Sequence, residues 1–450
     1  MNPELRRQFW LEMSLHRRIA APAVLALVFG LFAASAGERL DWRAELYMPA
    51  FSIAFVLLYL WGARQAAEAV GEEVRERTWD LQRLSALGPW TMTWGKLFGA
   101  TVFAWYAGGL CLAVMAFASP YLPDAVPIGW LLPAMVAGAV LVHGLALGMS
   151  LQAVRKDAKT GQRFGTVFLL LPLVLLLWTG AFSTGRGAEA PVHWYALRVA
   201  RMPFIALSVG AFAAWAVFGA YRSMCRELQV RTLPWAWPAF AVFLAGWLAG
   251  FAGSGEAFGS FQAFVFFGVL CCSLLTYVAL LGELTTAMVI RRALAKAAQG
   301  EWRRALEELP VWTATLALGF AFALAAPAAF SGAGNFGGIV QWKGLHDFAT
   351  QAPLAVMLAA ARDCAILVFF ASAARPRRVE AVTILYLVLL WWIIPGLLAA
   401  MGLAPLAQVL NPFASLDAAK AALVMGVQAA LASALAAWRW NRHYGTPARG

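Results

Sequence analysis

Residues 71–96 read GEEVRERTWDLQRLSALGPWTMTWGK, a charged stretch between two long apolar runs. The stretch is too charged to lie inside a membrane, so the flanking runs hold both of its ends at the membrane surface. Gly88 and Pro89 mark the end of a helix within it. The pattern is typical of a helix lying on the membrane, or of an element on which a soluble partner docks. Apolar residues at three-, four- and seven-residue spacing predict one apolar face of this helix: Val70, Val74, Leu81, Leu84 and Leu87.

The composition of the 450-residue chain indicates a membrane protein. Hydrophobic residues make up 62% of it and charged residues 13%, against about 45–50% and 25% in soluble domains. The apolar runs are about twenty residues long, which suits membrane-spanning helices and exceeds the length of a membrane β-strand. We therefore expect an all-α polytopic membrane protein.

The apolar runs predict twelve transmembrane helices, with the N and C termini in the cytoplasm. Under this topology most Lys and Arg residues fall on the cytoplasmic side, which follows the positive-inside rule. The net charge of +12 then reflects orientation in the membrane, and we expect no nucleic-acid partner. The predicted spans are 19–36, 46–62, 97–118, 128–153, 164–181, 203–221, 233–253, 260–282, 311–330, 353–374, 382–401 and 418–438.

The spans fall into two sets of six, which predicts two pseudo-repeated halves, 1–225 and 226–450. In each half the longest inner segment lies between the second and third spans, at 63–96 and at 283–310. An internal duplication accounts for this arrangement, with chance spacing as the alternative. The second inner segment also has an apolar face, formed by Leu294, Ala298, Trp302, Leu306 and Leu309.

Motifs for nucleotide or metal chemistry are missing from the sequence. The nearest approach to a Walker A motif is Gly88 followed by Gly95-Lys96-Leu97, which has the wrong spacing and lacks the Ser or Thr that holds magnesium. We therefore expect no catalytic residue, metal or cofactor in this chain. The cysteines sit mostly in apolar runs, without a metal-binding or disulfide spacing, and are expected to be buried small hydrophobes: Cys111, Cys225, Cys271, Cys272 and Cys364.

His143, Arg362 and Asp363 fall well inside predicted spans, where charge is costly. Arg362 and Asp363 lie near the centre of the tenth span and His143 lies in the fourth. Neighbouring residues of a helix point about 100° apart, so Arg362 and Asp363 need not pair with each other. A substrate contact or a proton relay is one interpretation, and a buried structural pair or a shifted span is the other.

The charged stretch resembles the cytoplasmic loop of ABC-2 type permeases, the membrane subunits of one class of ATP-driven exporter. That loop carries acidic residues, a basic residue and Thr, a Leu-rich turn, a Pro, and a Lys at the next span. The resemblance covers roughly residues 2–225: residues 2–18 resemble an N-terminal interfacial helix, and 182–202 fits an outer segment between two spans. The matching residues of the loop are Glu73, Glu76, Arg77, Thr78, Leu81, Leu84, Leu87, Pro89 and Lys96.

The resemblance implies that Glu73 to Leu87 form a coupling helix seated in a groove of a separate ATP-binding subunit. Two such subunits would carry the ATP and magnesium, and their closure would tilt the spans between inward-open and outward-open states. The family usually has six spans and works as a dimer, so twelve spans imply a fusion of both halves, or else a homodimer. The second loop lacks the acidic–basic–Thr pattern, and its candidate docking residues are Trp302, Arg303, Arg304 and Glu307.

These features predict the permease of an ABC exporter, not itself an enzyme, in a bacterial-type cytoplasmic membrane and surrounded by its lipids. An ion-coupled secondary transporter using His143, Arg362 and Asp363 is the first alternative. A membrane enzyme acting on glycans or lipids is the second, although its catalytic loop would have to be longer than the outer loops here. A membrane scaffold is the third. The spans and outer loops suit a lipid, a lipophilic drug or a peptide equally as substrate.

Overall fold

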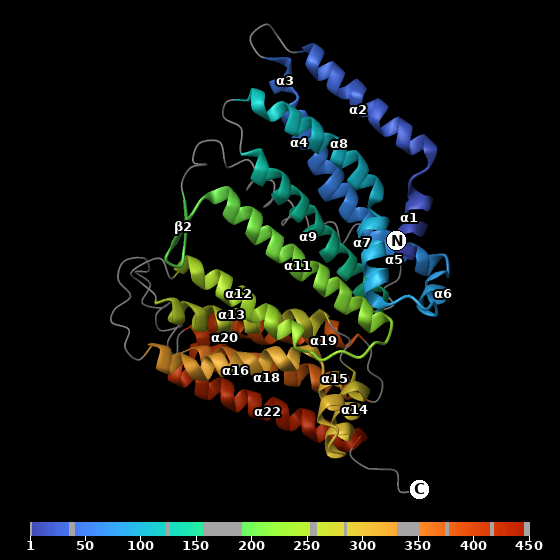
Figure 1. Ribbon diagram of the computed structural model, residues 1–450. Helices are drawn as coiled ribbons and strands as arrows, with labels where there is room; N and C mark the ends of the chain where they lie inside the picture. Colours follow the sequence, from blue (N-terminus) through green and yellow to red (C-terminus); the bar gives the residue numbers. More distant parts are fainter. Residues whose placement is uncertain are drawn as a thin grey trace. The chain divides into compact units, whose positions relative to one another are not determined.

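The computed structural model describes residues 2–35, 41–122, 127–155, 191–252, 259–282, 286–330, 352–373, 378–414 and 418–444. The described chain is helical apart from its loops and one two-stranded sheet (Figure 1), formed by β1 (Val192–Trp194) and β2 (Leu197–Val199). It forms two compact units. The first comprises Met1–Val192 and Arg198–Thr232, and the second comprises His193–Leu197 and Leu233–Gly450.

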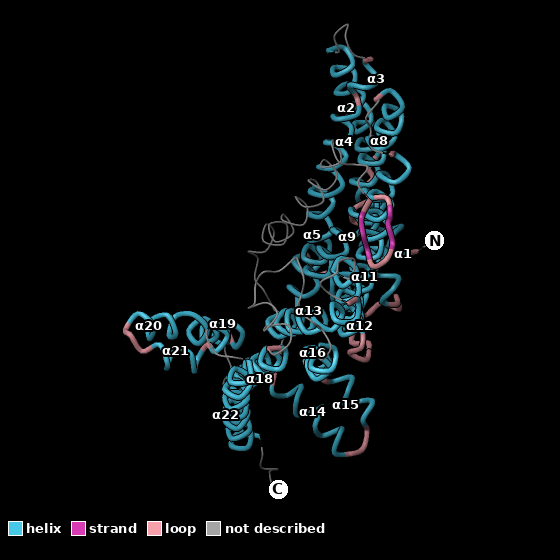
Figure 2. Tube along the Cα trace, turned by 90° about the vertical axis from the view of Figure 1, so that its left-hand side faces the viewer, coloured by secondary structure: helices cyan, strands magenta, loops and turns pink. Residues whose placement is uncertain are grey.

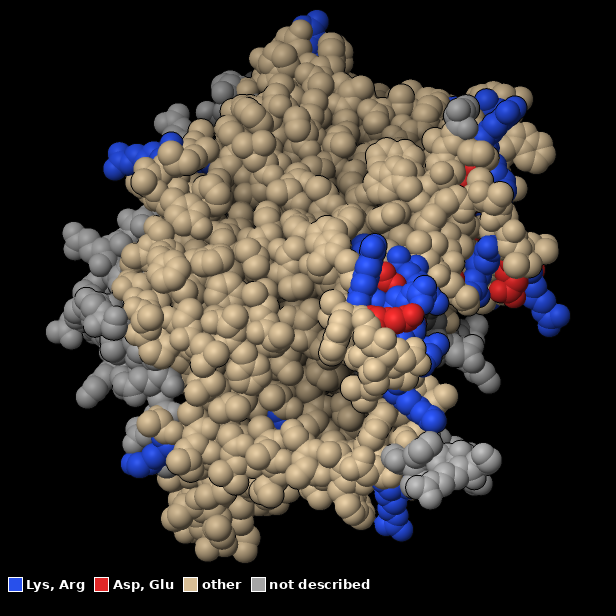
Figure 3. Space-filling model, turned by 60° about the horizontal axis from the view of Figure 1, so that its bottom comes forward, with Lys and Arg blue, Asp and Glu red and all other residues tan. Residues whose placement is uncertain are grey.

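Ten helices of the described chain are long and apolar enough to cross a membrane, so the expected all-α, multi-pass architecture is confirmed. The predicted seventh span corresponds to a shorter apolar helix, α12 (Ala236–Ala252), and span 164–181 lies outside the described residues. The total of twelve stays a prediction. In Figure 3 charged side chains gather in a few places and leave most of the visible face uncharged, as lipid contact requires.

In the first unit, α9 packs against both α5 and α11, and α4 packs against α8. The buried core between these helices is made of Ala, Leu, Met and aromatic side chains. Its helices are α1 (Pro3–Glu12), α2 (Leu15–Ser35), α3 (Trp42–Glu45), α4 (Tyr47–Phe55), η1 (Val56–Trp61), α5 (Gly62–Arg75), α6 (Trp79–Arg83), α7 (Pro89–Gly99), α8 (Val102–Ala118), η2 (Ser119–Tyr121), α9 (Ile128–Arg155) and α11 (Arg201–Glu227).

In the second unit, α13 packs against α12, α16 and α18, and α18 packs against α22. Figure 2 shows α20 and α21 lying side by side as a helical hairpin. Besides α12, its helices are α13 (Ser260–Gly282), α14 (Ala287–Ala298), α15 (Trp302–Glu308), α16 (Val311–Phe330), α18 (Pro353–Ala371), α19 (Val379–Val388), η3 (Leu389–Ile393), α20 (Ile394–Ala400), α21 (Ala404–Leu410), η4 (Pro412–Ala414) and α22 (Ala418–Tyr444).

The β-hairpin lies in the segment predicted as 182–202, whose part before residue 191 is outside the described chain. The end of β1 and the turn after it contact α12: the Trp194 indole donates to the Trp247 carbonyl at 3.0 Å and the Tyr195 hydroxyl to the Gly246 carbonyl at 2.6 Å. Glycine at 250 leaves room for the Trp194 ring, which a Cβ there would overlap. The hairpin turn is therefore part of the second unit.

All five cysteines are buried and carry free thiols, which confirms the prediction that they act as small hydrophobes. Cys225 lies in the first unit on α11, and Cys364 lies in the second unit on α18. These two buried thiols can report separately on the unfolding of the two units.

The charged stretch does not form the single helix that its spacing predicts. Helix α5 ends at Arg75, and Arg77 adopts a left-handed conformation with φ of 60°. The Thr78 amide then donates to the Glu73 carbonyl at 2.9 Å and the Arg77 amide to the Val74 carbonyl at 3.2 Å. This is a Schellman motif, which ends the helix in the middle of the predicted apolar face.

The break separates the members of that face. Val70 remains on α5 and is fully buried in the core, whereas Leu81 and Leu84 follow the break and are exposed. Gly88 and Pro89 mark a start and not an end, because Pro89 is the first residue of α7. The apolar residues of the stretch therefore do not form one face: Val70 packs in the core, and Leu81 and Leu84 lie on the exposed surface.

Each unit contains a π-helix within a predicted span, η1 and η3, and a side chain from another helix or turn supplies a hydrogen bond to it. His143 Nε2 lies 2.7 Å from the Leu58 carbonyl in η1, and Asn411 Nδ2 donates to the Trp391 carbonyl in η3 at 3.1 Å. A π-helix shifts backbone hydrogen bonds, and inside a membrane a carbonyl left without a donor is costly. The two side chains satisfy such carbonyls.

Candidate functional site

A buried charge cluster lies beneath the first loop, where α1, α5 and α7 meet. We define it as the buried residues Glu4, Gln8, Glu73 and Lys96, together with Arg7, whose side chain is 40% exposed. The exposed fractions of Lys96, Glu4 and Glu73 are 0%, 2% and 6%. Such burial of charge is tolerated only when partners satisfy it. The cluster therefore fixes where the three helices meet.

The partners in the cluster cross between helices. Arg7 donates twice to Glu4, at 3.1 and 2.9 Å, and also to the Glu73 carboxylate. Lys96 Nζ contacts the other oxygen of Glu73 and lies 3.4 Å from Glu4 Oε1. Two carboxylates and two cations thus balance one another.

Helix α1 is held on α7 by short-range geometry. The Asn2 side chain caps α1 by accepting from the Glu4 amide at 2.9 Å, and its amide group donates to the Thr91 carbonyl at 2.8 Å. Gly95 faces Glu4 so closely that a Cβ at 95 would lie 2.5 Å from the Glu4 Cβ. A glycine at this position lets the two helices touch, which brings Glu4 within reach of Lys96.

The ionised states of the cluster stabilise one another. Burial raises the pKa of Glu4, but the Arg7 hydrogen bonds and the Lys96 charge outweigh it and hold the pKa below its ordinary value of 4.5. The hydrogen bonds with Glu4 raise the pKa of Arg7. At neutral pH both groups are therefore charged.

Above the cluster, the loop presents exposed side chains, which we call the loop surface: Glu76, Arg77, Leu81 and Leu84. The exposed fractions of Leu81 and Leu84 are 71% and 85%, unusual values for leucine outside lipid or an interface. Glu76 and Arg77 are also exposed. An apolar pair beside a charged pair is suited to a partner surface.

The other predicted docking residues have different positions. Glu73 is buried within the cluster, and the Thr78 hydroxyl donates to the Glu73 carbonyl at 3.2 Å. Leu87 is half-buried. Trp79, which the sequence reasoning did not select, is buried with its ring 5.1 Å from Lys96 Nζ. Of the matched loop residues, Glu73 and Lys96 therefore belong to the charge cluster, and the loop surface is formed by Glu76, Arg77, Leu81 and Leu84.

The stretch predicted as the second inner loop contains a hairpin of α14 and α15, held by ion pairs nearer the surface. Lys296 Nζ lies 2.6 Å from Glu308 Oε1, and these side chains are 20% and 18% exposed. The candidate residues lie on α15: Trp302, Arg303 and Arg304 are exposed, and Glu307 is half-buried. Gly300 precedes them with φ of 79°. The hairpin shows the same order of features as the first loop: a residue in the left-handed conformation, a tryptophan two positions later, and then a proline.

Arg362 and Asp363 lie at the centre of α18 and pair with each other, with Arg362 Nε 2.7 Å from Asp363 Oδ1. The sequence reasoning left this pairing open, and the pair forms because the long arginine side chain bends back to its neighbour. The Tyr277 hydroxyl and the Trp391 indole both donate to Asp363 Oδ2, at 2.7 and 3.0 Å. Sequence spacing gives no signal for these two aromatic partners.

Arg362 reaches two further groups. Its Nη1 donates to Gln428 Oε1 at 2.6 Å, and its guanidinium carbon lies 4.6 Å from the Trp391 ring centroid. Its Nη2 is buried without a hydrogen-bond partner among the described residues. Gln428 in turn donates to the carbonyl of Val409 in α21. Gln428 is a polar residue inside the predicted span 418–438, and this was the sequence signal that could have identified it as a partner of a buried charge.

His143 has its partners in the first unit, whereas Arg362 and Asp363 belong to the second. Its ring is fully buried, bonds the Leu58 carbonyl and lies edge-on to Trp105 at 5.4 Å. Gly62 makes room for it, since a Cβ at 62 would overlap the imidazole. These contacts suit a structural role in closing η1.

Comparison of the chain with models of protein families, with curated proteins and with solved structures found no match. The ABC-2 resemblance therefore rests on the sequence of the loop and its flanks, and a functional interpretation has to be argued from the geometry described above.

Proposed function

We propose that the chain is the permease subunit of an ATP-driven exporter of the ABC-2 type, in a bacterial-type cytoplasmic membrane. A separate ATP-binding subunit, carrying ATP and magnesium, docks on the loop surface and drives the spans. The observation that carries the proposal is the exposure of Leu81 and Leu84 beside Glu76 and Arg77, on a loop braced by a buried charge cluster.

The loop surface has the chemistry of a docking site. Burial of an exposed leucine side chain contributes about 1.5–3 kcal/mol, so Leu81 and Leu84 together supply useful contact energy. Glu76 and Arg77 lie at the left-handed turn, where charges of both signs set the register of a partner. The proposal therefore places the apolar contact on α6 and the orienting charges at the turn before it.

The buried charge cluster gives the dock a rigid base. Glu73 lies three residues before Glu76 on the same chain segment, and its carboxylate is held by Arg7 from α1 and Lys96 from α7. A push on the loop is therefore passed to three helices instead of bending the loop. In this proposal Glu73 and Thr78 position the dock, and the exposed residues touch the partner.

A second ATP-binding subunit would dock on α15 through Trp302, Arg303, Arg304 and Glu307 if one chain supplies both permease halves. The exposure of Trp302, at 67%, supports this extension. Purification of the complex distinguishes the two assemblies by stoichiometry. One permease chain per two ATP-binding subunits supports the fused form, whereas two permease chains indicate a homodimer.

Co-expression with an ATP-binding subunit encoded beside the permease tests the dock. Glu76→Lys combined with Arg77→Glu should abolish co-purification of the two proteins, because both orienting charges are reversed. The matched control is Glu12→Lys combined with Arg17→Glu, which reverses a partly exposed ion pair at 2.7 Å between the last residue of α1 and the start of α2. A complex that survives the loop reversal and the control equally would contradict the docking assignment.

A secondary transporter is the second candidate, and the buried Arg362–Asp363 pair favours it. Transport would then continue without ATP and stop when an uncoupler dissipates the ion gradient. Asp363→Asn should abolish such transport while the protein still folds, because Asp363 would carry the coupling charge. Unchanged transport in a folded Asp363→Asn variant would exclude this mechanism.

A further inference from the structure

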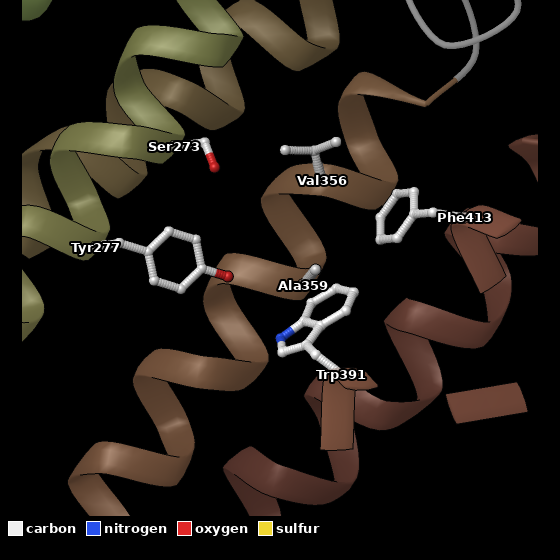
Figure 4. Close-up of a pocket in the computed structure, with 6 residues that line it drawn as sticks. All are labelled: Ser273, Tyr277, Val356, Ala359, Trp391 and Phe413. Atoms are coloured by element: carbon white, nitrogen blue, oxygen red, sulfur yellow. The ribbon is translucent and has the colours of Figure 1, made fainter. Parts of the chain in front are cut away.

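An open pocket of about 250 Å³ lies in the second unit among α13, α18, η3 and η4. Figure 4 shows three aromatic rings arranged around the space in front of α18, with the Ser273 hydroxyl turned towards it. The residues that line the cavity are Ser273, Tyr277, Val356, Ala359, Trp391 and Phe413. We refer to it as the aromatic cavity.

Ser273 is the first indication that the aromatic cavity takes a ligand. Hydroxyl side chains inside helices usually donate to a carbonyl of the preceding turn. Thr276, Ser372 and Thr383 do so, to Cys272, Val368 and Val379 at 2.7, 2.7 and 2.8 Å. Ser273 is 9% exposed, and its hydroxyl, which borders the pocket, makes no hydrogen bond to the described residues.

The walls of the aromatic cavity are held in place by the Arg362–Asp363 pair behind them. Tyr277 and Trp391 both donate to the same oxygen of Asp363, at 2.7 and 3.0 Å. Phe413 stacks on Trp391 with ring centroids 5.7 Å apart and an interplanar angle of 24°. These contacts fix the rings before any ligand arrives, which lowers the entropic cost of binding.

The lining selects the class of ligand. The described residues that line it include no charged side chain, and Arg362 and Asp363 neutralise each other at 2.7 Å behind the rings. A net charge on the ligand would therefore lie unpaired in an apolar site. Pockets for drug-sized ligands occupy about 300–1,000 Å³, so this smaller space suits a compact molecule.

We propose that the aromatic cavity binds a small, neutral, planar molecule that is mostly apolar and makes one hydrogen bond to Ser273. Tyr277, Trp391 and Phe413 offer ring faces and edges for such a molecule, which a flexible alkyl chain uses poorly. Because the site uses no residue of either inner loop, the proposal is independent of the ATP-binding partner.

Photolabelling of the full-length protein in lipid nanodiscs tests this proposal. The probe is a tritiated alkylphenol that carries a diazirine, and labelled peptides are mapped by mass spectrometry. Labelling of peptides from α13, α18 and η3 should saturate, and unlabelled propylphenol should compete better than cyclohexane. Cyclohexane is apolar but is not planar and has no hydroxyl group, so it lacks both features that the proposal requires.

Two variants make the test specific. Ser273→Ala should raise the probe concentration needed for half-saturation about 3- to 10-fold, which is the loss of affinity expected for one hydrogen bond. Ser372→Ala should leave this concentration unchanged, because the Ser372 hydroxyl donates to the Val368 carbonyl. Ala359→Leu should abolish labelling by filling the space, in protein that still elutes as the wild type does in gel filtration.

Several outcomes would overturn the proposal. Labelling that rises linearly with probe concentration would indicate partition into lipid. Equal competition by propylphenol and cyclohexane, with no effect of Ser273→Ala, would indicate a lipid acyl site. Labelling unchanged by Ala359→Leu would place the probe elsewhere. The experiment contains no ATP-binding subunit, so its failure leaves the docking proposal intact.

Discussion

Replacing Lys96 with methionine removes one of the two cations of the buried charge cluster and keeps an unbranched side chain of similar length. The Lys96 side chain is fully buried, contacts Glu73, and lies 3.4 Å from Glu4 Oε1 and 3.0 Å from Gln82 Oε1. Its loss leaves two buried carboxylates that share Arg7 as their one cation in the cluster, while the Gln8 amide donates to both of them, at 3.1 and 3.4 Å. The variant therefore tests whether the cluster holds the first unit together.

The expected loss of stability for Lys96→Met is about 3 kcal/mol. Removing one partner of a buried ion pair costs about 3–5 kcal/mol, and Arg7 continues to compensate both carboxylates, which places this variant at the lower end. Glu73→Gln combined with Lys96→Met should be less destabilising than the two single changes added together. The double-mutant cycle should give a coupling energy of about 2 kcal/mol.

The assay is maleimide labelling of buried thiols across a series of SDS concentrations, in mixed micelles. Cys225 reports on the first unit and Cys364 on the second. Lys96→Met should lower the SDS midpoint for Cys225 and leave that for Cys364 unchanged. Mass spectrometry of the two peptides separates the signals.

A lysine of the second unit provides the control. Lys296 contacts Glu308 at 2.6 Å, but its side chain is 20% exposed, and such pairs contribute about 1 kcal/mol or less when water reaches them. Lys296→Met should therefore shift neither midpoint by much. If Lys96→Met were as mild as Lys296→Met, or if the coupling energy were near zero, the cluster would not be a structural brace.

Three further predictions concern single positions. The pKa of Glu4 lies below 4.5, so its ionised carboxylate stabilises the fold above about pH 4.5, and this stabilisation is lost as the pH falls through the lowered pKa. The free energies of unfolding of Glu4→Gln and the wild type should therefore become equal at such low pH. Gly62→Ala would displace His143 and lower the free energy of unfolding by about 1–3 kcal/mol. Gly71 has open space around it, so Gly71→Ala should instead stabilise α5 by up to about 1 kcal/mol in the same labelling assay. Arg77→Gly should stabilise the helix end by about 1 kcal/mol, because glycine adopts the left-handed conformation without strain, yet weaken co-purification of the ATP-binding subunit by removing a docking charge.

The spans could be predicted from the sequence because lipid imposes a strong local pattern. About twenty successive apolar residues suffice to cross the hydrocarbon, and ten of the described helices follow that rule. The end of α5 could not be predicted in this way. Left-handed helix ends are usually marked by glycine, as at Gly300, but Arg77 takes the same conformation and the periodicity of Val70, Val74 and Leu81 runs through it.

The buried charge cluster was hidden for a different reason. Glu4, Glu73 and Lys96 are 23 to 92 positions apart in the chain, and the close approach of α1 to α7 depends on Gly95. The sequence pattern assigned Glu73 to a partner surface and Lys96 to the start of a span, each in isolation. Charge pairing between distant helices follows from packing, which local spacing does not encode.

The two loops predicted at 63–96 and 283–310 share an order of structural features, which favours a common origin. They differ in how their tryptophan residues and ion pairs are buried, and this difference bears on docking. Arg77 and Gly300 are left-handed residues that end a helix, and each is followed two positions later by a tryptophan. Trp79 is buried against Lys96, whereas Trp302 is exposed. In the described part of the second loop the ion pairs lie nearer the surface, so a partner docked there would push on a hairpin and not on a three-helix base. If both loops dock ATP-binding subunits, the first is therefore the loop that transmits the larger part of the motion to the spans.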